Sequence, residues 1–233
     1  MILAVLQARM SSSRLPGKVL APVLGQPMIA RQVERLRRAR RIDELVVATS
    51  VEPGDDPLAA ACADLGVTVF RGDLHDVLSR FCAVLEARPE AAAMVRLTAD
   101  CPLTDWTLID ALVERHLAED ADYTSNNLPE RTWPHGLDAE VARPAALLRA
   151  GREAADPYER EHVTPFLYRR PGEHRLAGLP RAPSLTHLRW TVDYPEDLAF
   201  VRRVYAQLYP AKPDFGTDDI LALAENSSRG GEP

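Results

Sequence analysis

Short apolar runs alternate with helical patterns through the first half of this chain. The runs have the length of buried strands, and apolar residues between them recur at helical spacing. This alternation predicts an α/β fold in which helices cover both faces of a mostly parallel sheet. The predicted strands are residues 2–6, 45–49, 67–70 and 94–97, and the predicted helices are 27–41, 58–65, 78–85 and 109–116.

The second half is less regular. We interpret residues 1–225 as one domain with a small substrate or dimerisation lobe, and the polar, glycine-containing segment 226–233 as a flexible tail. Short strands are predicted at 123–125, 139–141 and 188–192, and helices at 144–154, 157–168 and 195–208. The helix predicted at 27–41 also carries arginines that we expect on its solvated face: Arg31, Arg35, Arg37, Arg38, Arg40 and Arg41.

Charge and composition exclude some partners. The formal net charge is −6, whereas nucleic-acid binding usually shows a basic balance, so we expect no nucleic-acid partner. No apolar run has the length needed to cross a bilayer, and we expect no membrane partner. Cys62, Cys82 and Cys101 are far apart and odd in number, which favours reduced thiols in the cytoplasm.

The first predicted strand leads into a turn with the sequence Q-A-R-M-S-S-S-R-L-P-G-K, residues 7–18. Its cations and hydroxyls suit a triphosphate, and ligands of open α/β sheets bind at the carboxyl ends of strands. The turn is not a P-loop, because Ser12 replaces a required glycine and Val19 follows the lysine. A surface loop with incidental charges is the alternative. The candidate phosphate ligands are Arg9, Ser11, Ser12, Ser13, Arg14 and Lys18.

Two aspartates are expected at the same edge of the sheet. Asp100 follows the predicted strand 94–97, and Asp193 follows the predicted strand 188–192. Mg²⁺ usually takes one or two protein carboxylates together with substrate phosphates, so the pair is a candidate magnesium site. Each aspartate could instead cap the segment that follows it.

Polar motifs in the irregular half suggest a site for a hydroxylated substrate. The motifs are W-P-H-G-L-D-A-E and E-R-E-H, and the candidate ligands are His135, Asp138, Glu161 and His162. Packing of a helix against the sheet is the alternative for Glu161 and His162. Asp120 and Asp122 form a D-x-D sequence of the glycosyltransferase type, which we interpret as a solvated helix end.

The order of these motifs resembles the spore-coat polysaccharide cytidylyltransferases, relatives of the CMP-KDO and CMP-sialic acid synthetases. Besides the N-terminal turn, R-L-T-A-D-C-P-L and R-W-T-V-D-Y-P-E-D-L, the shared motifs include F-R-G-D-L-H-D-V-L-S-R-F, H-G-L-D-A-E-V and E-R-E-H-V-T-P-F. The resemblance extends from the first residue to about residue 208. It implies a Rossmann-like nucleotide-diphospho-sugar transferase fold, Mg²⁺ dependence and a homodimer.

The resemblance also assigns roles to individual positions. Thr98 and Ala99 depart from the better-known synthetases, which leaves the choice of base open there. The assigned residues are Leu6, Gln7 and Ala8 for base and ribose, Arg9, Arg14 and Lys18 for the triphosphate, Arg80 near the nucleotide, and Asp100 and Asp193 for Mg²⁺.

The implied reaction joins CTP to an acidic sugar of the nonulosonic type and releases pyrophosphate. Arg14 and Lys18 would neutralise the leaving group, and a protonated histidine, Arg160 or Arg189 would pair with the sugar carboxylate. Two other functions remain open. One is a glycosyltransferase with its metal on the D-x-D sequence, and the other is a non-catalytic nucleotide-binding protein on the same fold.

Overall fold

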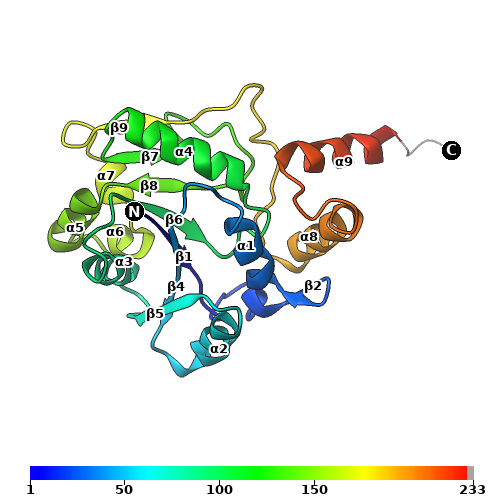
Figure 1. Ribbon diagram of the computed structural model, residues 1–233, viewed down its shortest axis with the longest axis horizontal. Coiled ribbons are helices and arrows are strands. Elements are labelled where there is room, and N and C mark those ends of the chain that lie inside the picture. The colour runs from blue at the N-terminus through cyan, green and yellow to red at the C-terminus, as the bar shows by residue number, and fades with distance from the viewer. Residues whose placement is uncertain (230–233) are drawn as a thin grey trace.

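The computed structural model describes residues 1–229, with side chains through Leu223. Its main sheet consists of β1 (Ile2–Gln7), β4 (Glu44–Ser50), β5 (Thr68–Gly72), β6 (Ala93–Thr98), β7 (Tyr123–Ser125), β8 (Glu140–Ala142) and β9 (Leu176–Gly178). The strand order is β5-β4-β1-β6-β8-β7-β9 (Figure 1). Only β8 runs antiparallel to its neighbours among these strands, which confirms the mostly parallel α/β sheet.

Helices cover both faces of this sheet (Figure 1). They are α1 (Met28–Leu36), α2 (Asp56–Asp64) and α4 (Trp106–Ala118) on one face, and α3 (Val77–Glu86), α5 (Pro144–Glu153), α6 (Pro157–His162) and α7 (Pro165–Tyr168) on the other. Because side chains of a strand alternate between faces, Ala4 and Leu6 of β1 enter the first core, and Leu3 and Val5 enter the second. Gln7 therefore belongs to the face covered by α3.

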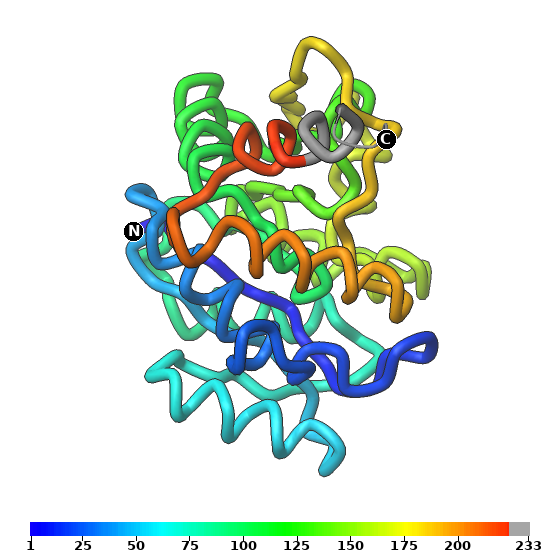
Figure 2. The backbone as a smooth tube through the Cα atoms, turned by 90° about the vertical axis from the view of Figure 1, so that its right-hand side faces the viewer, coloured from blue at the N-terminus to red at the C-terminus, as the bar shows by residue number. Residues whose placement is uncertain are grey.

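A third apolar core joins the two ends of the chain. It packs α8 (Pro195–Leu208) and the start of α9 (Thr217–Arg229) against β2 (Pro22–Val23) and the first residue of α1, while η1 (Lys18–Leu20) and β3 (Gln26–Pro27) lie against α1. Figure 2 shows α8 running beside the N-terminal segment. Trp190 and Val192 are buried in this core, so the segment before α8 is held next to the N-terminal turn.

The C-terminal helices also bury arginines of α1, so the prediction of a solvated face is wrong for Arg31 and Arg35. Arg35 is 1% exposed, donates to the Thr104 carbonyl at 2.7 Å and lies 4.4 Å from the centroid of the Phe215 ring. Arg31 donates to the Val23 carbonyl at 3.1 Å. The spacing of residues within α1 cannot show that residues from the other end of the chain pack against these arginines.

Other boundaries also differ from the predictions. The predicted strand 188–192 is wrong, because this segment forms a single bridge between Arg189 and His135. The predicted helix 157–168 is divided into α6 and α7 at Val163, whose φ is 73°. Helix α9 was not predicted and includes residues 226–229 of the expected tail, while residues 230–233 lie outside the described residues. No helix in the described part is long and apolar enough to cross a membrane.

Candidate active site

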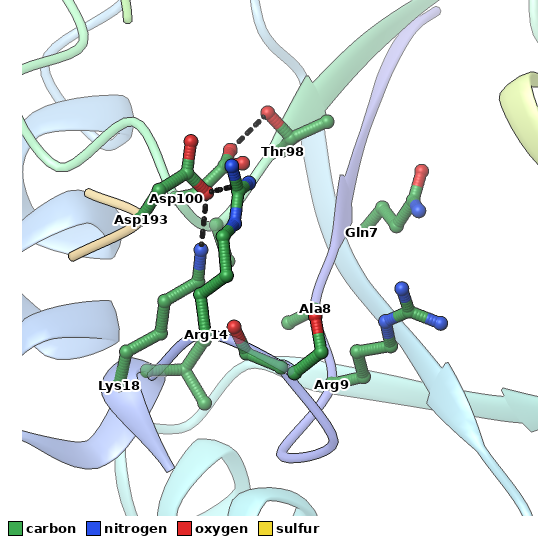
Figure 3. A pocket seen from close by; sticks show the side chains of 12 residues that line it. Gln7, Ala8, Arg9, Arg14, Lys18, Thr98, Asp100 and Asp193 are labelled. Atoms are coloured by element: carbon green, nitrogen blue, oxygen red, sulfur yellow. Dashed lines mark hydrogen bonds and ion pairs between the residues drawn. The ribbon is translucent and has the colours of Figure 1, made fainter. Parts of the chain in front are cut away.

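A pocket opens at the carboxyl ends of β1 and β6, where the sequence predicts a phosphate site. In Figure 3, Arg14, Lys18, Asp100 and Asp193 lie on one side and Gln7 and Arg9 on the other, with Ala8 between them. Of the expected nucleotide and metal residues, Leu6 and Arg80 are buried and Ser11 is exposed, and none of these three lines the pocket. The lining consists of Gln7, Ala8, Arg9, Ser12, Ser13, Arg14, Lys18, Val19, Thr98, Ala99, Asp100 and Asp193.

The N-terminal turn is held by Asp55, a residue that lies outside all of the sequence motifs. Met10 N donates to Asp55 Oδ1 at 2.7 Å, and the Met10 carbonyl accepts from the amides of Ser12 and Gly17, both at 2.9 Å. Burial alone would raise the pKa of Asp55, but hydrogen bonds from Met10 and Ser50 lower it. An aspartate just before a helix ordinarily indicates a cap, so no local pattern points to this contact.

Three cations surround the carboxylate of Asp193. Its Oδ1 lies 2.7 Å from an Arg14 nitrogen and 3.1 Å from Lys18 Nζ, and its Oδ2 lies 2.6 Å from Arg189. Desolvation opposes ionisation, but Arg189 and Lys18 lower the pKa of Asp193. Asp197 also lies 3.6 Å from Arg189, so three cations face two carboxylates and one positive charge is in excess, which suits a polyanion.

Asp100 has a different environment. Its Oδ1 accepts from Thr98 Oγ1 at 2.6 Å, and it makes no ion pair with any described residue. The Asp100 carbonyl accepts from Val192 N at 2.7 Å, so a backbone hydrogen bond, and no strand, brings the Asp193 segment here. Neither aspartate caps a helix, because Asp105 caps α4 and Asp197 accepts from the amides that precede α8.

The donor set is compatible with Mg²⁺ bound together with phosphates. Within the described residues no group of three or more acidic, histidine or cysteine side chains could hold a metal by itself. Asp100 and Asp193 are two oxygen ligands in one pocket, and Mg²⁺ commonly combines such carboxylates with substrate phosphates and water. Asp193 would have to give up cationic partners to serve as a ligand.

Arg80 carries a guanidinium that is buried without a partner. It is 1% exposed, and none of its three nitrogen atoms has a hydrogen-bond partner among the described residues. Burial lowers its pKa, and the charge of Arg9 lowers it further. A Cβ on Gly72 would lie 2.6 Å from Arg80 Cγ, so glycine is required for this packing. Donors left unpaired inside a protein indicate that a ligand or water completes them.

The four expected sugar ligands fall into two separate groups. His135 and Asp138 precede β8, and Asp138 accepts from Asn127 Nδ2 at 2.7 Å and pairs with Arg131 at 2.6 Å. Desolvation and the nearby Arg131 lower the pKa of His135. Glu161 and His162 are exposed on α6, where the His162 ring lies 4.2 Å from that of Tyr158. Neither group lines the pocket.

Other candidate charges are already engaged. Arg160 pairs with Asp76 at 2.5 Å, and Arg189 pairs with Asp193. Asp120 and Asp122 both pair with Arg143, and they precede β7, which is parallel to β6 because both are antiparallel to β8. They therefore lie at the edge of the sheet opposite the pocket, which supports the interpretation of a helix end.

The fold and the pocket define an α/β protein with a cation-rich pocket at the carboxyl edge of its sheet. The chain belongs to the cytidylyltransferase family, whose model matches residues 3–206. The resemblance seen in the motifs is thereby confirmed.

Individual proteins agree with this assignment. The chain is 34% identical to the spore coat polysaccharide biosynthesis protein SpsF of Bacillus subtilis (strain 168), over 95% of this chain and 93% of that protein. It is 32% identical to the 3-deoxy-manno-octulosonate cytidylyltransferase of Syntrophotalea carbinolica, over 78% and 80% of the two chains. A solved cytidylyltransferase structure from Leptospira borgpetersenii matches this chain with a TM-score of 0.90 and 28% sequence identity. The match covers 97% of this chain and 95% of that one.

Proposed function

We propose that this protein transfers the cytidylyl group of CTP to an acidic sugar, releases pyrophosphate and uses Mg²⁺. The observation that carries the proposal is the presence of Arg14 and Lys18 in the same pocket as Asp100, whose carboxylate makes no ion pair with a described residue. Arg189 adds a third cation through its ion pair with Asp193, which also lines the pocket. A triphosphate with its metal needs both kinds of group, fixed positive charge and an oxygen ligand.

The two sides of the pocket suit the two ends of a nucleotide. The side with Arg14 and Lys18 would hold the phosphates, and the side with Gln7 and Arg9 would hold the nucleoside (Figure 3). The unpartnered guanidinium of Arg80 lies close enough to Arg9 for their charges to interact. Its donors would be satisfied by carbonyl or ring-nitrogen acceptors of a pyrimidine.

In the proposed reaction a sugar hydroxyl attacks the α-phosphorus as the bond to pyrophosphate breaks. Such transfers depend on positioning and on charge stabilisation more than on covalent chemistry by the protein. Arg14 presents a planar fork and Lys18 a point charge toward the charge that develops on pyrophosphate. Asp100 would hold Mg²⁺ together with Asp193, once Asp193 has given up its cationic partners. The metal would polarise the phosphate that is attacked.

The acidic class of sugar is supported by a relative's name and by local charge. The Syntrophotalea relative is named for 3-deoxy-manno-octulosonate, a sugar acid. In this chain, the charges of Arg131 and Arg189 act on His135 against that of Asp138, and either arginine would suit a sugar carboxylate. Asp138 would bind sugar hydroxyls, while Glu161 and His162 on α6 would contact only a substrate that reaches beyond the pocket.

Thermal-shift measurements with CTP, UTP, GTP and ATP, each with and without Mg²⁺, test the part of the proposal that concerns nucleotide binding. A ligand at a hundred times its Kd adds about 2.7 kcal/mol of stability, so we expect a clear shift with CTP and Mg²⁺. The variant Arg14→Met, which keeps Lys18 and Asp193, should reduce that shift. The absence of a shift with any triphosphate would contradict the proposal.

Product analysis then separates this function from the alternatives. We expect pyrophosphate release with CTP and a panel of sugar acids, and none with the corresponding neutral sugars. A glycosyltransferase would instead release a nucleotide from a nucleotide sugar, and a non-catalytic protein would release neither. The proposal also includes a homodimer that acts in the cytoplasm, and light scattering at micromolar concentration tests the dimer.

A further inference from the structure

A largely buried ion pair lies in the sheet beside Gln7, which lines the pocket. Arg96 of β6 is in direct register with Glu140 of β8. Arg96 Nη1 donates to Glu140 Oε2 at 2.8 Å, and the two side chains are only 14% and 15% exposed. Thr164 Oγ1 donates to the same carboxylate oxygen at 3.2 Å. The guanidinium of Arg96 is therefore fixed in place.

Arg96 also contacts a residue that lines the pocket. Its Nη2 donates to Oε1 of Gln7 at 3.3 Å. The sheet register pairs Arg96 with Val5, and Gln7 is two residues further along β1, on the same face. The geometry thus connects the ion pair to Gln7, the last residue of β1, which leads into the N-terminal turn.

This contact determines which end of the Gln7 amide is free. A guanidinium has donors and no acceptor, so it can bond only to the oxygen of a glutamine amide. The NH₂ group of Gln7 then remains for the pocket, and Figure 3 shows it on the side of Arg9, with the oxygen turned the opposite way. A glutamine without this partner could turn over and present either a donor or an acceptor.

We propose that Arg96 is a positioning residue that fixes the Gln7 amide as a hydrogen-bond donor to the nucleoside of the bound nucleotide. This inference rests on the proposed function for the identity of the ligand. The acceptors available on a cytidine nucleotide are the base carbonyl, the base ring nitrogen and the ribose oxygens. A purely structural ion pair would stabilise the sheet but would leave the Gln7 amide free to turn.

The orientation of Gln7 can be measured without any nucleotide. Glutamine side chains are labelled with ¹⁵N, and the Gln7 signal is assigned by its loss in Gln7→Met. The double variant Arg96→Met/Glu140→Gln removes the guanidinium without leaving a buried carboxylate unpaired. We expect the order parameter of the Gln7 amide to fall below about 0.6 in the double variant.

The matched control is Glu140→Gln alone, which keeps the contact between Arg96 and Gln7. We expect the Gln7 amide to stay ordered in this control. An amide that is equally ordered in the wild type, the control and the double variant would overturn the proposal. This result is independent of whether CTP is the substrate.

Binding of CTP with Mg²⁺, measured by calorimetry, tests whether Arg96 acts through Gln7. Loss of one hydrogen bond predicts affinity about tenfold weaker in Gln7→Met and similarly weaker in the double variant. The combined triple variant should bind no more weakly than Gln7→Met, because the two changes remove the same interaction. Independent effects that multiply to about a hundredfold would contradict the proposal.

Two further nucleotides identify the acceptor. A Gln7→Met effect that disappears with 2′-deoxy-CTP assigns the acceptor to the ribose, and an effect that persists assigns it to the base or to another ribose oxygen. Failure of the wild type to bind CTP would count against the proposed function, while the order parameter would still decide the role of Arg96.

Discussion

The ammonium of Lys18 lies 3.1 Å from Oδ1 of Asp193, and the two residues are only 8% and 9% exposed. Lys18 Nζ also donates to the Val192 carbonyl at 2.5 Å, so the chain itself satisfies the lysine in the absence of phosphate. A phosphate that approaches Lys18 and Arg14 must therefore compete with a carboxylate that is already bound. In the proposed reaction Mg²⁺ would take over that carboxylate, which would make binding of the metal and the triphosphate cooperative.

The variant Asp193→Asn should bind CTP more tightly than the wild type when EDTA removes all metal. The substitution removes the competing negative charge, and we expect a gain of about three- to tenfold, the scale of one moderately screened charge interaction. Calorimetry in EDTA measures the difference. Glu90→Gln is the control, because it removes one exposed negative charge from the loop before β6, at the far edge of the sheet. Weaker metal-free binding in Asp193→Asn would show that phosphate does not compete with the Asp193 carboxylate for Lys18 and Arg14.

The variant Asp100→Asn should affect turnover with Mg²⁺ and not metal-free binding. Asp100 has no cationic partner among the described residues, so we expect metal-free CTP binding to change little. Turnover with Mg²⁺ should fall about a hundred- to a thousandfold, as for loss of one preorganised electrostatic group. Pyrophosphate release and calorimetry provide the two measurements. Unchanged turnover in the presence of Mg²⁺ would show that Asp100 is not a metal ligand.

The sequence predicted the parts of the fold and site that depend on local pattern. The first four strands of the parallel sheet, and the turn that follows β1, could be located because apolar runs and turn residues are adjacent in the chain. Asp100 could be placed for the same reason, since it lies two residues beyond β6. Asp193 lines the same pocket as Asp100, as predicted, but the predicted strand before it does not form.

The missed features all depend on contacts between distant segments. Arg35 looks solvated in its own helix and is buried by Phe215 from the end of the chain. Asp55 looks like a helix cap but holds Met10, 45 residues earlier. The pair of Arg96 and Glu140 exists only because β8 is antiparallel to β6, a reversal that the repeating strand–helix order does not predict.

Asp55 holds the N-terminal turn through its hydrogen bond with Met10 N, and this contact should matter for nucleotide binding. Asp55→Ala removes the acceptor of Met10 N, so the turn should loosen and the affinity for CTP with Mg²⁺ should fall about tenfold. Ser50→Ala is the matched control, because Ser50 donates to the other oxygen, Oδ2, and leaves the bond to Met10 intact. Calorimetry on both folded variants makes the comparison. Equal losses of affinity would mean that Asp55 acts through general stability.

The buried His116 should make the protein less stable as the pH falls below neutrality. Its Nδ1 lies 2.9 Å from Thr124 Oγ1, and burial lowers the pKa of His116 from 6.5 to about 4. Between these values the unfolded chain binds a proton that the folded chain does not, so the free energy of unfolding decreases as the pH falls through this window. At pH 5 the loss should be about 2 kcal/mol relative to pH 7.5. Urea denaturation of the wild type and of His116→Gln at both pH values measures it, because the variant keeps a polar side chain but does not titrate. A wild type that loses no more stability than His116→Gln would show that the histidine becomes protonated without a penalty in the fold.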